Sequence, residues 1–302
     1  MDDREEQLSW EQRVGRPVAV ASFAAAVLLI AALIYSSSKL NVQTDNTIEG
    51  LRLIDDRKTD VFITTILQGL STALIAAPLW FLFEATRFRR PEVPTIARYL
   101  AIAGPVLTGL LQIVRQIQVA DVAGKLDAGL KSSAQAPLSP DAANEFAKDQ
   151  LSSGSLQIVG SIGLAAGLAL AFAFILISLN AMRAGLLSRF MGILGIIVGV
   201  LFVIPLLGPV PIVEVFWVAA LGLLFLGKWP QGGRGPAWET GEAISWPTAS
   251  DRQAELVAAR AEREEAEGYR DEPDDEPRGA AVNGHGDDAQ HPRSKKRKRK
   301  RR

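Results

Sequence analysis

The 302-residue chain contains no cysteine and two histidines, and both scarcities limit its chemistry. Without cysteine there is no disulfide, no thiolate metal site and no cysteine nucleophile. His285 and His291 lie in the polar C-terminal part, so the apolar part has neither an imidazole base nor a histidine metal ligand. Phosphate-binding glycine loops and the motifs of serine hydrolases and zinc proteases are also missing. The sequence therefore predicts a protein that is not an enzyme and binds no cofactor or metal.

Charge balances over the whole chain but is scarce in long stretches of it. The 33 Lys and Arg residues equal the 33 Asp and Glu residues in number, yet long apolar runs recur up to about Gly227. Because about 20 helical residues cross the ~30 Å hydrocarbon core of a bilayer, these runs predict an all-α, polytopic membrane helix bundle. The expected transmembrane helices cover residues 17–36, 61–84, 96–119, 155–180, 188–206 and 210–227.

Arginine clusters indicate which side of the membrane each connection faces. Arginines are frequent in residues 1–16, in 87–98 and in 183–189, whereas the opposite connections are poor in Lys and Arg and richer in Asp and Glu. Since basic connections stay in the cytoplasm, we expect both termini to be cytoplasmic in a bacterial inner membrane. An even number of spans requires the same. The first apolar run is too long for a typical signal peptide, so we interpret it as an uncleaved anchor.

Three segments follow from this topology: a cytoplasmic N-terminal segment (1–16), a six-helix transmembrane domain (17–227) and a mostly disordered cytoplasmic tail (228–302). The third expected helix continues past the membrane, because polar and apolar residues alternate with helical spacing from Arg115 onward. A proline then breaks the helix, and Ser139-Pro140-Asp141 has the pattern of a new helix start. We therefore expect an extracytoplasmic helical hairpin at about residues 115–153.

Four polar residues near the outer ends of their spans form a candidate polar membrane cluster. Gln112, Arg115 and Gln116 share one helix face, and Glu214 begins the sixth span, so an ion pair between Arg115 and Glu214 is geometrically possible. Polar groups at membrane depth are costly and often functional. One interpretation is an outward-facing polar vestibule for a small solute. The alternative, which we favour, is interfacial snorkelling with an interhelical hydrogen bond.

Two glycine pairs predict close helix packing. Gly163 and Gly167 are four residues apart in the fourth span, as are Gly195 and Gly199 in the fifth, so each pair lies on one helix face. We expect these neighbouring spans to pack on each other, and the alternative is a homodimer seam. The oligomeric state stays open. Pro78 in the second span and Gly104-Pro105 in the third predict kinks, because a proline removes one helical hydrogen bond.

The C-terminal part carries three tryptophans among prolines and glycines: Trp229, Trp238 and Trp246. We expect them to lie at the inner membrane interface, and the alternative is a short peptide ligand. Residues 251–267 are rich in helix formers with hardly any apolar face, which predicts a solvated or marginal helix. Residues 268–292 cannot bury a core and should be disordered.

The chain ends in a polybasic segment, residues 293–302. Such a cluster is attracted to anionic lipid headgroups. RNA or ribosomes are rival polyanions, but aromatic side chains that would stack on bases are absent from the run. The expected partners are therefore the lipid bilayer and anionic lipid, with nucleic acid or ribosome less favoured. The candidate contacts are Lys295, Lys296, Arg297, Lys298, Arg299, Lys300, Arg301 and Arg302.

The stretch from Ala184 to Gly227 resembles the last two spans of uncharacterised actinobacterial six-span membrane proteins. The resemblance rests on the turn G-L-L-x-R at residues 185–189 and on the following G-I-L-G at 192–195. The Trp-Pro repeat and the polybasic end are similar to tails in that family. The resemblance covers about half of the chain and implies an architecture, since the family has no assigned activity.

The sequence thus favours a membrane-embedded structural or interaction protein whose basic tail contacts anionic lipid. A small-solute transporter or channel is the first alternative. A ribosome-docking or insertase-like factor is the second, supported by the basic end alone.

Overall fold

The structure, a computed structural model, describes residues 3–40, 47–132, 145, 147–149, 151–152, 154–203, 211–229, 234–246 and 249–268. Over these ranges the ordered elements are helices and there is no strand, which confirms the all-α fold. The chain divides into two compact units, Met1–Trp246 and Pro247–Arg302. We call the first unit the bundle.

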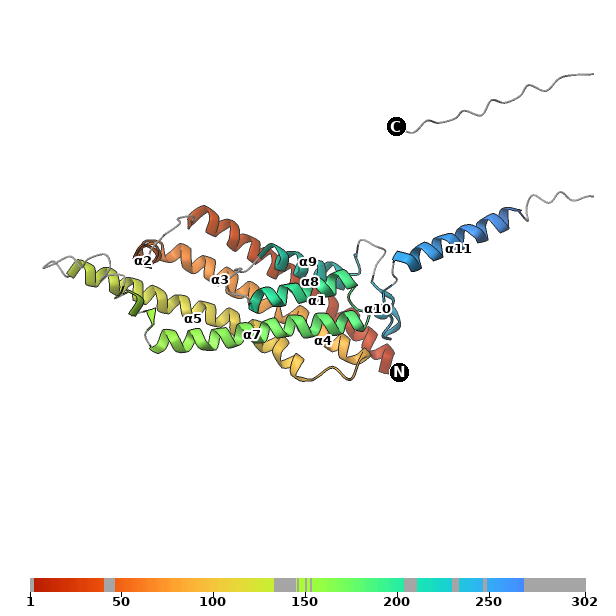
Figure 1. Ribbon diagram of the computed structural model, residues 1–302, viewed down its shortest axis with the longest axis horizontal. Helices are drawn as coiled ribbons and strands as arrows, with labels where there is room; N and C mark the ends of the chain where they lie inside the picture. The colour runs from red at the N-terminus through yellow and green to blue at the C-terminus, as the bar shows by residue number, and fades with distance from the viewer. Residues whose placement is uncertain are drawn as a thin grey trace, which may run out of the picture. The chain divides into compact units, whose positions relative to one another are not determined.

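Apolar helices of membrane-spanning length dominate the bundle (Figure 1). Four stretches are long and apolar enough to cross a membrane: α1, α3 with α4, most of α5, and α7. These are the features of a membrane protein. The helices are α1 (Asp3–Lys39), α2 (Thr47–Asp56), α3 (Lys58–Leu74), α4 (Ala76–Arg89), α5 (Ile96–Ser132), α7 (Gly154–Arg183), α8 (Arg189–Val203), α9 (Pro211–Phe225) and α10 (Pro236–Thr240).

The last two apolar helices are shorter than the others. α8 and α9 have 15 residues each, about 22 Å of helix, which is less than the ~30 Å hydrocarbon core. The expected count of six spans therefore stays a prediction. Both helices nevertheless lead back to the end of the bundle at which α7 stops, because α8 begins there and α9 ends there (Figure 1).

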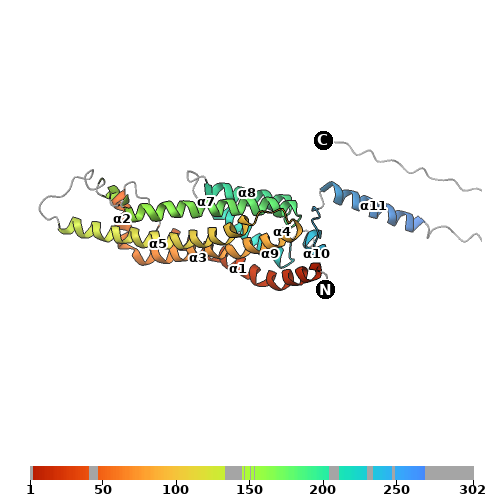
Figure 2. The ribbon, with the colours of Figure 1, turned by 90° about the horizontal axis from the view of Figure 1, so that it is seen from below.

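The long helices run side by side. α5 packs between α3 and α7, α1 packs on α3 and α9, and α8 packs on α7 (Figures 1 and 2). The N-terminus of α1, the C-terminus of α7 and helix α10 share one end of the bundle, which we call the N-terminal end. Helix α2 lies at the opposite end, which we call the α2 end.

The second apolar stretch is broken into α3 and α4 at a single residue, Ile75. Pro78 has no backbone N–H to donate to the carbonyl of Leu74, and the chain forms a tighter bond from Ile75 N to Thr72 O (3.2 Å) at this point. The break at Ile75 agrees with the kink expected at Pro78, whereas α5 continues through Pro105 as one helix.

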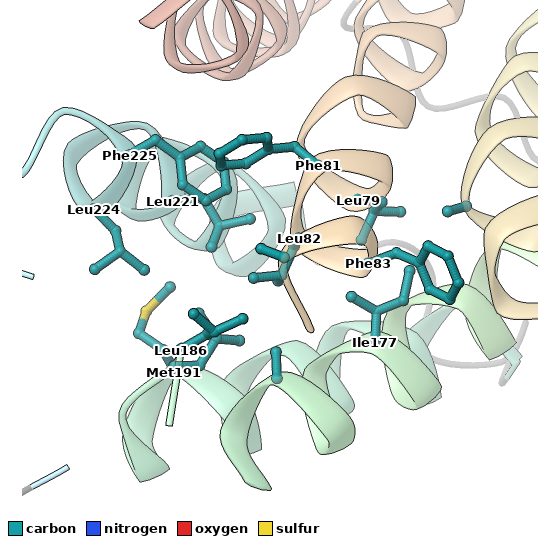
Figure 3. Close-up of a cluster of buried hydrophobic side chains, with 14 of the residues drawn as sticks. Leu79, Phe81, Leu82, Phe83, Ile177, Leu186, Met191, Leu221, Leu224 and Phe225 are labelled. Carbon is teal, nitrogen blue, oxygen red and sulfur yellow. The ribbon is translucent and has the colours of Figure 1, made fainter. Parts of the chain in front are cut away.

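Helix α4 forms the centre of the core. Leu79, Phe81, Leu82, Phe83 and Ala85 are each at most 1% exposed. Its first half, residues 76–83, is apolar on all sides, and such a stretch has to be enclosed; α1, α5, α7 and α9 pack around the helix. Figure 3 shows its side chains among those of α7, α8 and α9. The interior of the bundle on the side of its N-terminal end is therefore filled by apolar side chains.

A second, smaller core lies at the α2 end. α5 continues without interruption to Ser132, so the expected extension of the third span is confirmed. Val122 and Ala123 of this extension pack with Ile48 and Leu51 of α2. Ala147 and Leu156 complete the cluster, which gives the second arm of the expected 115–153 hairpin its contacts. The predicted helix start at residues 139–141 lies outside the described residues.

The N-terminal segment packs on the bundle, and its expected cytoplasmic location stays a prediction. α1 begins at Asp3 and continues through Pro17. Trp10 stacks on Phe81 at 5.5 Å between ring centroids and meets Trp80 edge-on at 5.8 Å. One face of residues 7–15 is thus buried or half-buried against the bundle, so this stretch is packed helix.

The compact unit that contains the apolar helices extends past residue 227 to Trp246, and the expected membrane boundary at 227 stays a prediction. Ala237 and Trp238 of α10 are 0% and 4% exposed and belong to the main core. Trp229 and Trp246 pack against the same core and are partly buried. The tail tryptophans thus contact their own chain, which neither interpretation of the sequence anticipated.

The second unit contains one described helix, α11 (Ala249–Gly268). Leu256 and Val257 are 72% and 64% exposed, so the solvated helix expected at 251–267 is present. The stretch expected to be disordered and the polybasic segment, residues 293–302, lie outside the described residues.

Candidate functional site

The arginine-rich segments of the sequence meet at the N-terminal end of the bundle. α1 begins there, α4 ends there, α5 begins there, and the α7–α8 turn lies there (Figures 1 and 2). This grouping is the geometry on which the positive-inside argument depends. The arginines concerned are Arg4, Arg13, Arg16, Arg87, Arg89, Arg90, Arg98, Arg183, Arg189 and Arg234.

Arg89 forms a buried, bidentate ion pair with Glu11 that joins three parts of the chain. Its two terminal nitrogens lie 2.5 and 3.0 Å from the two Glu11 carboxylate oxygens, and the side chains are 0% and 1% exposed. The guanidinium also donates to Ala85 O and, through Nε, to Ala237 O, both at 2.9 Å. Gln7 donates to Glu11 at 3.0 Å. The pair therefore links α1, α4 and α10.

Trp238 closes the N-terminal end of the core. Its indole N–H donates to Leu186 O at 2.9 Å, and its ring stacks on Phe81 with centroids 6.0 Å apart. The guanidinium carbons of Arg89 and Arg234 each lie 5.5 Å from the ring centroid, within cation–π range. The hydrogen bond of the indole N–H, the ring stacking and the two cation–π contacts together hold α10 against the bundle.

Arg234 neutralises the C-terminal end of α9. Gly227, at φ +71°, lets the chain turn back after the helix, and Arg234 then donates to the terminal carbonyls of Leu224 (3.2 Å) and Phe225. A cation at this end complements the helix dipole. Burial lowers the pKa of the Arg234 guanidinium from its ordinary value, while the charge of Glu11 acts in the opposite direction.

The turn between α7 and α8 is built by the G-L-L-x-R segment. Gly185 has φ +75°, a conformation that L side chains rarely adopt, and a Cβ there would collide with Ile244 O of the crossing 234–246 segment. Leu186 N bonds to Ala181 O at 2.9 Å, and Ser188 Oγ caps α8 by accepting from Met191 N at 3.3 Å. The conformation of the turn is thus fixed by its own hydrogen bonds and by the segment after α10, which packs against Gly185.

Arg183 and Arg189, on either side of that turn, line a cavity of 330 Å³. Both are exposed, and no hydrogen bond or ion pair joins either of them to another described residue. Met182, Leu187 and Ile193 supply an apolar wall, and Ser245 and Trp246 supply the rest of the lining. Two unpaired cations therefore lie beside apolar surface at the N-terminal end. We call this cavity the α7–α8 pocket.

The structure separates the predicted polar membrane cluster. Gln112 and Arg115 are exposed and line one cavity between α5 and α7, of 340 Å³. Gln116 is not part of that lining, and its buried amide nitrogen has no hydrogen-bond partner. Glu214 is 8% exposed and lies near Ser71 of α3, where α9 packs on α1.

The Arg115–Glu214 ion pair considered from the sequence is therefore not formed among the described residues. The reason is the order of the helices. Arg115 faces α7, whereas α9 packs on α1 and α8. Sequence position gave the depth of the two side chains along their helices and left open which neighbours those helices have.

The two glycine pairs have different surroundings. Gly199 lies against α7, where a Cβ would be 2.7 Å from Ala171 O, and Gly195 faces the same helix. This is the packing expected for the fourth and fifth spans. A Cβ on Gly163 or Gly167, by contrast, would meet nothing within 4 Å, and both line the cavity with Arg115. Gly195 and Gly199 therefore allow α8 to approach α7 closely, whereas Gly163 and Gly167 leave open space beside α7.

No cluster of three or more His, Asp or Glu residues that could hold a metal occurs in the described part of the chain. Comparisons with protein-family models, curated proteins and solved structures give no match to this chain. The class that the helices define is thus an all-α membrane protein. The resemblance to actinobacterial six-span proteins stays an expectation about architecture.

Proposed function

We propose that the protein is a multi-pass, non-enzymatic interaction protein of the bacterial inner membrane that binds anionic phospholipid at the N-terminal end of the bundle. In this proposal the N-terminal end faces the cytoplasm, as the arginine distribution predicts. The observation that carries it is the α7–α8 pocket, in which Arg183 and Arg189 stand unpaired above apolar side chains.

The chemistry of the pocket suits a phosphodiester headgroup. Guanidinium groups bind phosphate oxygens in a bidentate manner, and basic pockets between helices on the cytoplasmic side of membrane proteins accept anionic lipid headgroups. Met182, Leu187 and Ile193 give the pocket an apolar wall that would contact the upper part of an acyl chain. The pocket thus places cationic side chains next to apolar ones, which matches a lipid's anionic headgroup next to its acyl chains.

The polybasic segment, residues 293–302, provides a second contact with the same leaflet. Each Lys or Arg near an anionic surface contributes roughly 1 kcal/mol, and the attraction is screened by salt. Because more than 60 residues separate this segment from the last expected span, we expect it to contribute nothing to the fold of the bundle. The apolar packing around α4 supports an interaction role over the transporter alternative, which needs a polar path through the core.

The double variant Arg183→Gln/Arg189→Gln tests the pocket. The purified full-length chain is titrated with phosphatidylglycerol or phosphatidylcholine in detergent, and bound lipid is counted by native mass spectrometry. We expect the preference for phosphatidylglycerol to fall roughly tenfold, the value of one charged hydrogen bond. Arg16→Gln is the matched control, because Arg16 is exposed at the same end and does not line the pocket. An unchanged preference in the double variant would refute the proposal.

Truncation after Pro292 tests the tail. The bundle should keep its thermal stability in detergent, and binding of the isolated tail to anionic liposomes should weaken as salt shortens the Debye length from ~10 Å at 0.1 M to ~3 Å at 1 M. Liposome binding that ignores both lipid charge and salt would contradict the tail contact. Retention of ribosomes by the intact tail, at salt where lipid binding is lost, would favour the docking alternative.

A further inference from the structure

The cavity that contains Arg115 lies on the flank of the bundle, between α5 and α7, and Phe202 of α8 borders it. We call it the α5–α7 groove. Its volume is 340 Å³, and Arg115 and Gln112 lie at one end. Thr108 also lines the groove, and its buried hydroxyl has no hydrogen-bond partner among the described residues. Gly163 and Gly167 form the wall on α7. The groove therefore has a cationic end and a glycine-lined end that is apolar apart from the Thr108 hydroxyl.

The groove exists because side chains are missing from α7 at this level. A Cβ built on Gly160, Gly163 or Gly167 meets no atom within 4 Å. At the neighbouring crossing of the same two helices, a Cβ on Gly104 would be 2.7 Å from Leu170 N. The glycines of α7 are thus not required for close helix contact in this structure, and the space they leave is available to a ligand.

Helix length places the groove in the membrane. Arg115 is 16 residues beyond Tyr99, or about 24 Å along α5, and Gly163 is 20 residues before Arg183, or about 30 Å along α7. Tyr99 and Arg183 lie at the N-terminal end. Since the hydrocarbon core is ~30 Å thick, both measurements put the groove near the opposite boundary, on the α2 side. Gly167 lies one turn nearer the N-terminal end than Gly163, so the glycine-lined wall runs from that boundary toward the membrane centre.

Arg115 has no counterion in the described part of the chain. It is exposed and joined to no described residue by a hydrogen bond or an ion pair, and the same is true of Gln112. A guanidinium at the edge of the hydrocarbon core is costly unless it reaches the interface or meets an anion. The anion that the bilayer itself supplies at this depth is a lipid phosphate.

We propose that the α5–α7 groove binds one anionic phospholipid from the leaflet on the α2 side. The phosphate lies at Arg115, Gln112 donates to a phosphate or ester oxygen, and one acyl chain lies over Gly163 and Gly167. This site is on the opposite side of the membrane from the α7–α8 pocket. Its occupancy does not depend on Arg183, Arg189 or the polybasic segment.

Filling the groove tests the acyl-chain part of the proposal. Gly163→Leu places a side chain in space where nothing lies within 4 Å, so the lipid-free unfolding temperature should match that of the unaltered chain. In native mass spectrometry with phosphatidylglycerol, this variant should carry one lipid fewer than the unaltered chain. Gly154→Leu is the matched control, because Gly154 is an equally open position on α7 outside the groove.

Arg115→Gln tests the headgroup part. We expect the variant to lose its preference for phosphatidylglycerol over phosphatidylcholine at this site by roughly tenfold while keeping its affinity for the acyl chain. The measurement is made in the Arg183→Gln/Arg189→Gln background, so that the other lipid site does not contribute. The result for the α5–α7 groove is thereby obtained separately from the result for the α7–α8 pocket, so either proposal can be refuted without the other.

Three results would overturn the inference. One is an equal number of bound lipids in Gly163→Leu and in the unaltered chain. Another is an unchanged headgroup preference in Arg115→Gln. The last is competition by soluble glycerol 3-phosphate at the concentration that phosphatidylglycerol requires, which would identify a solute site of the kind that the vestibule interpretation describes.

Discussion

Replacing Glu11 with Gln removes one charge from the buried ion pair and leaves Arg89 unpaired inside the bundle. The two side chains are 0% and 1% exposed, so solvent does not compensate the remaining guanidinium. Breaking a buried pair by removing one partner costs about 3–5 kcal/mol. Because Gln has nearly the same shape as Glu, a loss in the free energy of unfolding would arise from the missing charge more than from altered packing. We expect Glu11→Gln to lower the free energy of unfolding by this amount.

The measurement is the free energy of unfolding of the purified chain, titrated with denaturing detergent, within a double-mutant cycle. Arg89→Gln should cost at least as much as Glu11→Gln, because it also removes the bond to Ala237 O. The double variant should cost clearly less than the sum, with a coupling energy of about 1–3 kcal/mol, as expected for residues in direct contact. Additive costs, or a loss below about 1 kcal/mol for Glu11→Gln, would refute the assignment of this pair as a buried link.

Three other predictions follow from the packing and the topology. Gly104→Ala should destabilise the bundle by about 1–3 kcal/mol through overpacking, whereas Gly163→Ala should be neutral in the same thermal-unfolding assay. Trp238→Ala should cost about 3–5 kcal/mol and expose its segment to hydrogen exchange, and unchanged protection would contradict its role in closing the core. In this chain without cysteine, Ser37→Cys should be labelled by an impermeant reagent on intact cells and Ser245→Cys should not; the reverse pattern would invert the proposed orientation.

The helical elements were predictable because membrane spans leave a strong local signal. The kink at Pro78 and the continuation of α5 past Arg115 follow from the residues of one helix alone. Helix neighbours were not predictable in the same way, because hydropathy gives the depth of a residue and says little about which helix faces it. Arg115 and Glu214 were therefore placed at the same depth and could not be placed on different faces of the bundle.

The buried contacts at the N-terminal end of the bundle could not be predicted from the sequence for a related reason. Glu11 and Arg89 are charged and lie at or beyond the ends of the apolar runs, so the hydropathy pattern gives no sign that they are buried together. Trp238 lies among prolines and glycines, a composition typical of linkers. The signal that was available is the triad of tryptophans, since large aromatic side chains rarely stay in a solvated linker without a partner. Pairing them with Phe81 needs the three-dimensional arrangement.

The bond between Arg89 and Ala237 also sets an order of events during synthesis. The two residues are 148 positions apart, so Arg89 and its partner Glu11 leave the ribosome long before α10 does. In that interval every apolar helix has been made, while the Phe81 ring and one Arg89 donor still lack the covering that Trp238 and Ala237 supply. Maturation of the bundle therefore has a late closing step that belongs to α10, which is made after all the long apolar helices. A fusion partner should be tolerated after Trp246, whereas one inserted at Lys228 should leave a bundle without its α10 cover and lower the amount of protein that accumulates in cells.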